Sequence, residues 1–491
     1  MTSVRQLSQR FSIWVAGLSL LALATVLRNQ PSTYIGDNRF EQYWNPGRRI
    51  TRTFTIWDGS RGLGWVREEF WPGATIPIGL FRLLGASPAL AEHLWHATLL
   101  AAAASGCVAL LRCYRPVLGW EHLVAALVYV FGPFSATFLL PSNLYFHHAL
   151  TPWLLVVVYR GLHSRARWRT ASAFALVVFL AGNLDTPGLI FAGVPMALLV
   201  VHEVWIERRI GLRWALGWFG RAGLLTSAVS AAAVAKSVIG ADALTQRLES
   251  TETPAVVALA SSWSESWRGL GFWVSYLREG GHPIRSTGAP YMTGIASVML
   301  TFAPAILAVG AIWWARRDRA RLLFAAMAVA GVFLMVGAHP AEHPPPWGRG
   351  WLWTLNGFPS ASVVRATYKA GITATLGVAV LVGIGVSALA GRARTVVGRR
   401  LVVAGLVVVL VSGATPFWRG ELYEPTNQMR AVAGHWSDAM AWLDHQQGTG
   451  QALIVPGATR AAYYWGWAGD DIQDALMKRG HLTSSAITVS P

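Results

Sequence analysis

The sequence predicts an all-α polytopic membrane protein with about eleven transmembrane helices. Hydrophobic residues make up 53% of the 491-residue chain, which also carries 25 tryptophans and has a mean hydropathy of +0.40. The apolar residues gather in long stretches, each near the ~20 residues that a helix needs to cross a bilayer. These stretches are residues 12–27, 89–111, 123–140, 146–160, 171–183, 187–203, 222–239, 290–315, 322–338, 371–390 and 401–417.

The net charge of +17 is concentrated in every second connection between these stretches. Six such connections hold 20 of the 41 Lys and Arg residues but 4 of the 24 Asp and Glu residues. Cytoplasmic loops carry this kind of basic excess, so we expect a plasma-membrane protein with its N-terminus in the cytoplasm and its C-terminus outside. The basic side chains would meet anionic lipid head groups, and we expect no nucleic-acid partner. The six connections are residues 1–11, 112–122, 160–170, 202–221, 315–321 and 391–400.

This topology divides the chain into two parts. Residues 1–417 form a transmembrane domain with short inner connections and long outer loops. Loops longer than closure requires are often functional, so we expect the chemistry at the outer face. Residues 418–491 begin a short extracytoplasmic α/β segment with a strand at 451–456. We expect this external domain to be truncated, so that it either packs onto the outer loops or needs a separate partner chain that supplies the rest. The outer loops are residues 28–88, 240–289 and 339–370.

The first outer loop opens with a short amphipathic pattern. Residues 37–45 put three aromatic side chains on one helical face, which predicts a short helix on the outer interface with these rings in the lipid boundary. Pro46-Gly47 is expected to end that helix. Alternating apolar residues in 48–57 then predict a strand or an extended arm. The three aromatic residues are Phe40, Tyr43 and Trp44.

Asp37 is the strongest candidate for catalysis. A partly desolvated carboxylate near the lipid interface suits general-base work on a sugar hydroxyl. The competing interpretation is an N-cap of the helix that follows, where Asp is favoured. Glu41 lies one helical turn further on, so the two carboxylates could hold a divalent cation, shape one pocket or form a solvated face. Glu68, Glu69 and Asp185 could join the site or serve as interface and turn residues.

Three cations lie near the outer ends of the predicted helices. They are Lys236 in the stretch 222–239, and Arg365 and Lys369, which stand one helical turn apart before the stretch 371–390. Such cations bind phosphates or pair with acids, Arg by a bidentate fork and Lys as a point charge. The competing interpretation is that they extend to lipid head groups.

We expect no metal site. His339, Glu342 and His343 match an H-x-x-E-H zinc pattern by letter. That chemistry needs one continuous helix, and Pro340 with Pro344–Pro346 interrupts it.

Four stretches in this order resemble the membrane portion of the actinobacterial alpha-(1->3)-arabinofuranosyltransferase family, which is of the GT-C class. The resemblance covers most of the chain at low identity. The stretches are Gly36-Asp37-Asn38-Arg39-Phe40-Glu41 with Asn45-Pro46, Phe70-Trp71-Pro72 through Leu84 with Leu94-Trp95, Arg365-Ala366-Thr367-Tyr368-Lys369, and Val455-Pro456-Gly457 running to Trp465-Gly466.

The resemblance implies a membrane glycosyltransferase for cell-wall biogenesis. It would move a pentofuranosyl unit, most simply arabinofuranose, from decaprenyl phosphate to a cell-envelope glycan. Asp37 would be the catalytic base, and Arg365 and Lys369 would contact the donor phosphate, with no cofactor required. The family pattern has Thr-Lys and then a second Asp after the first Asp, whereas Asn38, Arg39 and Glu41 stand here. These departures leave the identity of the sugar open. Arg39, Glu41 and Lys236 are further candidates for substrate binding.

Two other functions stay open. A transporter or flippase for a lipid-linked sugar would have broken helices with charges at the bilayer midplane, but the predicted spans carry almost no charge at their centres. A non-catalytic scaffold subunit of envelope assembly would show no transfer with a labelled lipid-linked sugar and a glycan acceptor.

Overall fold

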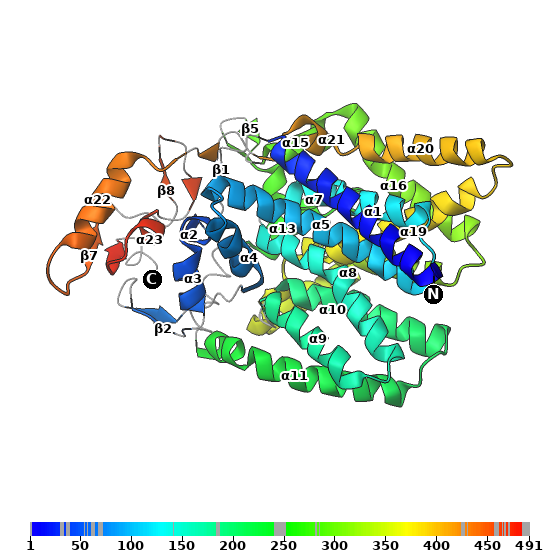
Figure 1. Cartoon of the computed structure of the whole chain (residues 1–491), viewed down its shortest axis with the longest axis horizontal. Coiled ribbons are helices and arrows are strands. Elements are labelled where there is room, and N and C mark those ends of the chain that lie inside the picture. Colours follow the sequence, from blue (N-terminus) through cyan, green and yellow to red (C-terminus); the bar gives the residue numbers. More distant parts are fainter. Residues whose placement is uncertain are drawn as a thin grey trace.

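Long helices packed side by side form the body of the protein, and short helices and strand pairs cover one end of it (Figure 1). The computed structural model describes residues 2–29, 34–35, 40–53, 55, 57–59, 64–66, 72–140, 142–182, 187–239, 252–279, 282–283, 285–423, 428–429, 431–455, 461–463, 465, 468–469 and 472–483. The long helices are α1 (Thr2–Leu27), α5 (Pro88–Tyr114), α6 (Trp120–Val130), α8 (Ser142–His163), α9 (Arg167–Leu180), α10 (Pro187–Val201), α11 (Leu212–Ile239), α16 (Ile295–Trp314), α17 (Ala320–Val336), α19 (Gly371–Ala390) and α20 (Val396–Ser412).

Each predicted apolar stretch overlaps one of these helices. The third stretch bends at Gly132 into the short helix α7 (Pro133–Phe138), and the sixth runs on into a π-helical turn, η1 (His202–Ile206). By length and composition, five segments of the described chain suffice to cross a membrane, and α1 and α17 contain shorter apolar helices. The five are Pro88–Tyr114, Trp120–Phe138, Pro187–Ile206, Ile295–Trp314 and Thr367–Ala390.

Helix α19 lies at the centre of the bundle and is buried over most of its length. Small residues let its neighbours approach closely, as they do in membrane helix pairs. A Cβ added at Gly377 would stand 2.4 Å from the backbone nitrogen of Ala328 in α17. One added at Gly383 would stand 2.3 Å from the carbonyl oxygen of Glu121 in α6. The glycines of α19 therefore set how tightly the core packs.

Ion pairs join the basic connections at one end of the bundle. Arg115, just after α5, contacts Asp318 at 2.7 Å and Glu121 at 3.5 Å, so it ties the connection before α6 to the one before α17. We call this end the short-turn end. Helix α5 ends at the short-turn end and α17 begins there. The start of α5 and the end of α17 therefore lie together at the other end, which we call the loop-rich end.

The loop-rich end carries the C-terminal segment. The N-terminal end of α1 lies at the opposite end of the bundle from α22 (Gly434–His445) and α23 (Gln473–Leu476) in Figure 1. Asn29 Oδ1 accepts a hydrogen bond from the backbone N–H of Leu422 at 2.9 Å. Burial, with Glu92 and Tyr43 nearby, raises the pKa of Tyr423 well above its usual value. The hydroxyl oxygen of this neutral phenol lies 2.8 Å from Nδ1 of His96 in α5.

The strands form two-stranded pairs. One pair joins the first outer loop to the C-terminal segment, β1 (Tyr34–Ile35) with β6 (Gln428–Met429). The expected strand at 451–456 is present as β7 (Ala452–Ile454), and it is paired in parallel with β10 (His481–Thr483). The remaining pairs are β2 (Trp57–Asp58) with β3 (Trp65–Val66), β4 (Arg278–Glu279) with β5 (His282–Pro283), and β8 (Ala461–Ala462) with β9 (Ala468–Gly469).

Two expectations for the first outer loop are wrong. The predicted strand at 48–57 is largely helical, because α3 spans Pro46–Thr53. Helix α2 does end just before Pro46, as expected, but Pro46 also begins α3, and proline suits a first helical position because its missing N–H would have no intrahelical partner there. Of the aromatic residues of α2 (Phe40–Trp44), Phe40 and Tyr43 are buried inside the protein and so do not lie on a lipid interface. Phe40 packs against Ile472 and Ala475 of the C-terminal segment.

Candidate functional site

Several predicted site residues lie outside the described residues. They are Asp37, Arg39, Glu68, Glu69 and Asp185. The backbone of Lys236 belongs to α11, but its side chain is not among those described. Glu41, Arg365 and Lys369 can be located in full.

The carboxylate of Glu41 is surrounded by arginines of the next helix. Its oxygens lie 3.0 Å from Arg52, 3.7 Å from Arg48 and 3.8 Å from Arg49. The three arginines follow each other at helical spacing in α3, so they reach the same acid. Glu41 is buried in α2 and thereby fixes the corner between α2 and α3. This set of partners, which the sequence did not predict, makes Glu41 an anchor for three cations.

Arg365 and Lys369 are brought together at the loop-rich end. Arg365 follows the 3-10 turn η4 (Pro359–Val364), and Lys369 belongs to the next turn, η5 (Thr367–Ala370), which leads into α19. The hydroxyl of Thr367 donates to the carbonyl oxygen of Met335 near the end of α17 at 3.1 Å. This bond holds the turn against the bundle.

The guanidinium group of Arg365 is built into the surrounding loops. Its side chain is buried, with 8% of the residue surface exposed. Nε donates to the carbonyl oxygen of Glu252 at 2.8 Å, and Nη1 donates to that of Ser362 at 3.0 Å. Arg365 therefore fixes its own turn to the second outer loop.

Lys369 is half-buried and differently placed. Its ammonium nitrogen lies 5.8 Å from the centroid of the Tyr368 ring. Glu252 and Arg365 are the charged groups within electrostatic reach. Among the described residues, this ammonium group has neither a hydrogen-bond partner nor an ion-pair partner. A cation without a protein partner at such a depth can take up an anion.

Glu252 completes the cluster and was missed by sequence reasoning. Its carboxylate accepts hydrogen bonds from Tyr368 Oη at 3.0 Å and from Trp273 Nε1 at 2.6 Å. The carboxylate thus lies among two aromatic donors and Lys369. The sequence offered one clue: Glu252 directly precedes Thr253-Pro254, an N-cap followed by proline at the first helical position, which begins the short helix α13 (Pro254–Ala260) within the loop.

Aromatic rings form a rigid platform behind the cluster. The ring of Tyr368 lies 5.2 Å from Phe272 and 5.5 Å from Phe138 of α7, and these two phenylalanines lie 4.7 Å apart. All three rings are buried. Because the platform fixes the Tyr368 ring, its hydroxyl is held toward Glu252 and the neighbouring Lys369 is held in place.

Two acids organise the second outer loop around this site. Besides Glu252, Glu265 accepts from Arg268 Nη1 and from Tyr276 Oη, each at 2.5 Å. Burial, followed by the nearby carboxylate, raises the pKa of the Tyr276 phenol. Arg268 also donates to the hydroxyl of Thr301 in α16 at 2.8 Å. The loop is therefore bonded to the bundle through buried polar groups.

Comparison with known proteins assigns the chain to a family. Residues 21–491 match the family described as "Alpha-(1->3)-arabinofuranosyltransferase, N-terminal GT-C domain". The chain belongs to the alpha-(1->3)-arabinofuranosyltransferase family. This confirms the family resemblance that the four stretches of the sequence indicated.

Relatives in the arabinofuranosyltransferase family are much longer. An alpha-(1->3)-arabinofuranosyltransferase of Mycolicibacterium smegmatis is 26% identical over 96% of this chain and 34% of its own length. One of Mycobacterium tuberculosis is 24% identical over 93% of this chain and 33% of its own length. The cryo-EM structure of arabinofuranosyltransferase AftD from mycobacteria shares the fold, with a TM-score of 0.67, 20% identity, and coverage of 96% of this chain and 31% of that one. The chain thus spans about a third of the length of the relatives it matches.

Proposed function

We propose that this chain is the membrane part of a glycosyltransferase that moves an arabinofuranosyl unit from decaprenyl phosphate to a cell-envelope glycan at the outer face of the membrane. The observation that carries the proposal is the ammonium group of Lys369, which has no partner among the described residues and lies beside the buried Arg365 in a chain of this family. In such a donor the negative charge lies on the phosphate, which belongs to the leaving group. A cation beside this phosphate therefore stabilises the departing anion.

The reaction needs a base, an electrophile and a leaving group. In the proposed step, the acceptor hydroxyl oxygen bonds to the anomeric carbon of the donor sugar, and its proton passes to Asp37. The bond between that carbon and the phosphate oxygen breaks, and the electron pair leaves with decaprenyl phosphate. Lys369 faces the phosphate and Arg365 adds its charge beside it, whereas Arg39 and Lys236 complete the substrate site. Glu41 contributes to that site through the three arginines that its carboxylate holds. No step requires a metal ion or another cofactor.

The proposed topology has eleven membrane spans, a cytoplasmic N-terminus and an extracytoplasmic C-terminus. Two observations support it. The basic connections 112–122 and 315–321 meet at the short-turn end through Arg115 and Asp318. The helix directions put η5 at the loop-rich end, the same end as the C-terminal segment. This is the arrangement expected when basic turns face the cytoplasm.

A reconstitution assay tests the proposal. The purified chain in lipid nanodiscs is given decaprenyl-phospho-arabinose with a labelled sugar and an arabinan oligosaccharide as acceptor. We expect label to appear on the oligosaccharide and decaprenyl phosphate to be released in equal amount. The same donor is also given to the chain in sealed vesicles. Movement of the label across the vesicle membrane without a new glycosidic bond would instead identify a transporter. The absence of both outcomes, while the donor still binds, would identify a scaffold.

A further inference from the structure

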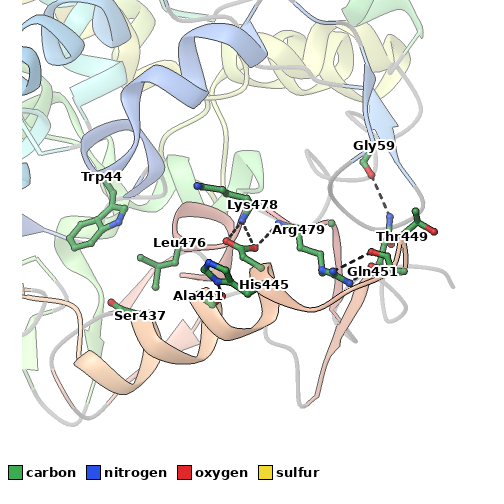
Figure 2. A pocket seen from close by; sticks show the side chains of 14 residues that line it. Trp44, Gly59, Ser437, Ala441, His445, Thr449, Gln451, Leu476, Lys478 and Arg479 are labelled. Atoms are coloured by element: carbon green, nitrogen blue, oxygen red, sulfur yellow. Dashed lines mark hydrogen bonds between the residues drawn. The ribbon is translucent and has the colours of Figure 1, made fainter.

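A polar hollow of about 920 Å³ lies between the first outer loop and the C-terminal segment (Figure 2). It shares no lining residue with the cluster around Arg365 and Lys369. The side chains that matter for its chemistry are Trp44, Ser437, His445, Thr449, Leu476 and Lys478. Trp44 ends α2, whereas the others belong to the C-terminal segment, so two distant parts of the chain build one hollow.

The wall of this hollow is held by hydrogen bonds that involve backbone groups. The guanidinium group of Arg479 donates to the carbonyl oxygens of Gly450 at 3.1 Å and Gly448 at 3.2 Å, and also to that of Gln446. The carboxylate of Asp444 accepts from the backbone N–H groups of Lys478 and Arg479. Figure 2 shows those of the bonds that join lining residues, such as the ones between Asp444 and the backbone of Lys478 and Arg479. The wall is therefore formed before any ligand arrives.

Another bond closes the hollow across the two parts of the chain. Gln451 Nε2 lies 3.4 Å from the carbonyl oxygen of Gly59 in the first outer loop. Together with the packing of Phe40 against Ile472, this contact keeps Trp44 opposite α22. The two sides of the hollow are thus fixed relative to each other.

Polar groups facing the hollow have hydrogen-bonding capacity to spare. His445 Nδ1 donates to the carbonyl oxygen of Ala441 at 2.6 Å, so its Nε2 is left as an acceptor. Among the described residues, the hydroxyls of Ser437 and Thr449 and the ammonium of Lys478 have no hydrogen-bond partner. These groups can both donate to and accept from a ligand rich in hydroxyls.

Trp44 supplies an aromatic surface beside these polar groups. It is half-buried and is stacked on Phe40 with ring centroids 5.3 Å apart and an interplanar angle of 24°. The stack fixes the indole, and the part of it that remains accessible lines the hollow. A rigid indole next to hydroxyl and imidazole groups matches a sugar, which has apolar C–H faces and a rim of hydroxyls.

We propose that this hollow binds a neutral oligosaccharide, namely a segment of the acceptor glycan next to the one that reacts. The inference rests on the proposed function, because the ligand is the acceptor glycan of the proposed transfer reaction. The charge of the hollow favours a neutral ligand over a phosphate: Asp444 and Arg479 are occupied by the protein itself, and Lys478 contributes a single exposed ammonium. The volume lies at the upper end of the range of small-molecule sites, which suits several sugar units.

Binding of an arabinan hexasaccharide to the intact chain in nanodiscs tests this site without any donor lipid. We expect Trp44→Ala to weaken binding about tenfold, since a stacked aromatic contact of this size contributes about one tenfold step in affinity. The double variant Ser437→Ala with His445→Ala should weaken binding to a similar extent while leaving the α2 packing intact. Trp442→Ala and His435→Ala are the matched controls, because both residues are exposed on α22 and neither lines the hollow. They should bind as the unmodified chain does.

The outcomes separate this site from the proposed transfer reaction. Weaker binding in the two hollow variants, with normal binding in the controls, supports the site even if the unmodified chain transfers no sugar. Unchanged hexasaccharide binding in the Ser437→Ala, His445→Ala double variant and in folded Trp44→Ala would overturn the site, whether or not transfer occurs. Equal binding of inorganic phosphate and hexasaccharide, both lost in Lys478→Met alone, would overturn the assignment to a neutral sugar.

Discussion

The hydroxyl of Tyr368 donates a hydrogen bond to the carboxylate of Glu252 at 3.0 Å, and this bond joins the turn before α19 to the second outer loop. Arg365 makes the same connection through the backbone carbonyl of Glu252. The two contacts hold one acid beside Lys369 without closing an ion pair between them. Lys369 is therefore positioned by its surroundings, while its ammonium group keeps its donors for another anion.

Removing the Glu252 carboxylate should destabilise this end of the protein. In Glu252→Ala, the buried Tyr368 hydroxyl and the Trp273 N–H lose their acceptor, and an unsatisfied buried group costs about 1–3 kcal/mol. We expect a lower apparent Tm of the chain in detergent, followed by tryptophan fluorescence. Glu342→Ala is the matched control, because Glu342 is an exposed acid in the third outer loop. Equal Tm values for the two variants would show that the Glu252 contacts contribute nothing to stability.

Lys369→Met should weaken binding of the lipid-phosphate donor. A charge-assisted contact contributes about 1.5–3 kcal/mol, so affinity for decaprenyl phosphate should fall about 10- to 100-fold. Binding of a neutral glycan acceptor should not change. The control is Arg419→Met, which removes an exposed cation after α20. If both variants bind the donor equally well, Lys369 serves lipid head groups and the phosphate site lies elsewhere.

Asp37→Asn should abolish sugar transfer and leave the fold unchanged. Asn caps a helix about as well as Asp, so a capping role alone would leave stability within a few tenths of a kcal/mol. As a base, however, Asn cannot take the proton of the acceptor hydroxyl. The measurements are transfer of labelled arabinose and the apparent Tm of the same preparation. Full activity in Asp37→Asn would remove Asp37 from the reaction.

Hydropathy and charge predicted the helices because both properties are local. The stretch 371–390 is apolar along its whole length and corresponds to α19. Arg365 and Lys369 could also be paired from sequence, because they stand four residues apart at the end of a loop. In the structure Arg365 follows η4 and Lys369 belongs to η5, the next turn, so the two side chains lie near each other.

Tertiary contacts decided what the sequence could not predict. The alternation of apolar residues in 48–57 suggested a strand, but Glu41 gathers Arg48, Arg49 and Arg52 on one helical face. That pairing depends on the corner at Pro46. Glu252 is separated from Tyr368 by more than one hundred residues, so no local pattern could show the bond between them.

Glu41→Gln should loosen the corner between α2 and α3. The side chain of Glu41 is 11% exposed and its three arginines 12–17%, so the change leaves partly buried cations without their acid. Breaking such a buried pair costs about 3 kcal/mol, which should appear as a lower apparent Tm. Glu421→Gln, at an exposed acid near the same end, should leave the Tm unchanged. A Tm equal to that of the unmodified chain would show that the arginines find other partners without a loss of stability.

The C-terminal segment should be extracytoplasmic and should depend on α2 for its stability. Phe40 of α2 packs against Val432, Ile472 and Ala475, and replacing a buried phenylalanine by alanine costs about 3–5 kcal/mol. We therefore expect external protease to cut residues 431–483 of the Phe40→Ala variant in intact cells much faster than those of the unmodified chain. Trp442→Ala, which removes an exposed ring from α22, should be cut at the unmodified rate. Protection of both variants in intact cells, with cleavage only in inverted vesicles, would reverse the proposed topology. Equal cleavage of both variants from outside would show that the segment folds without α2.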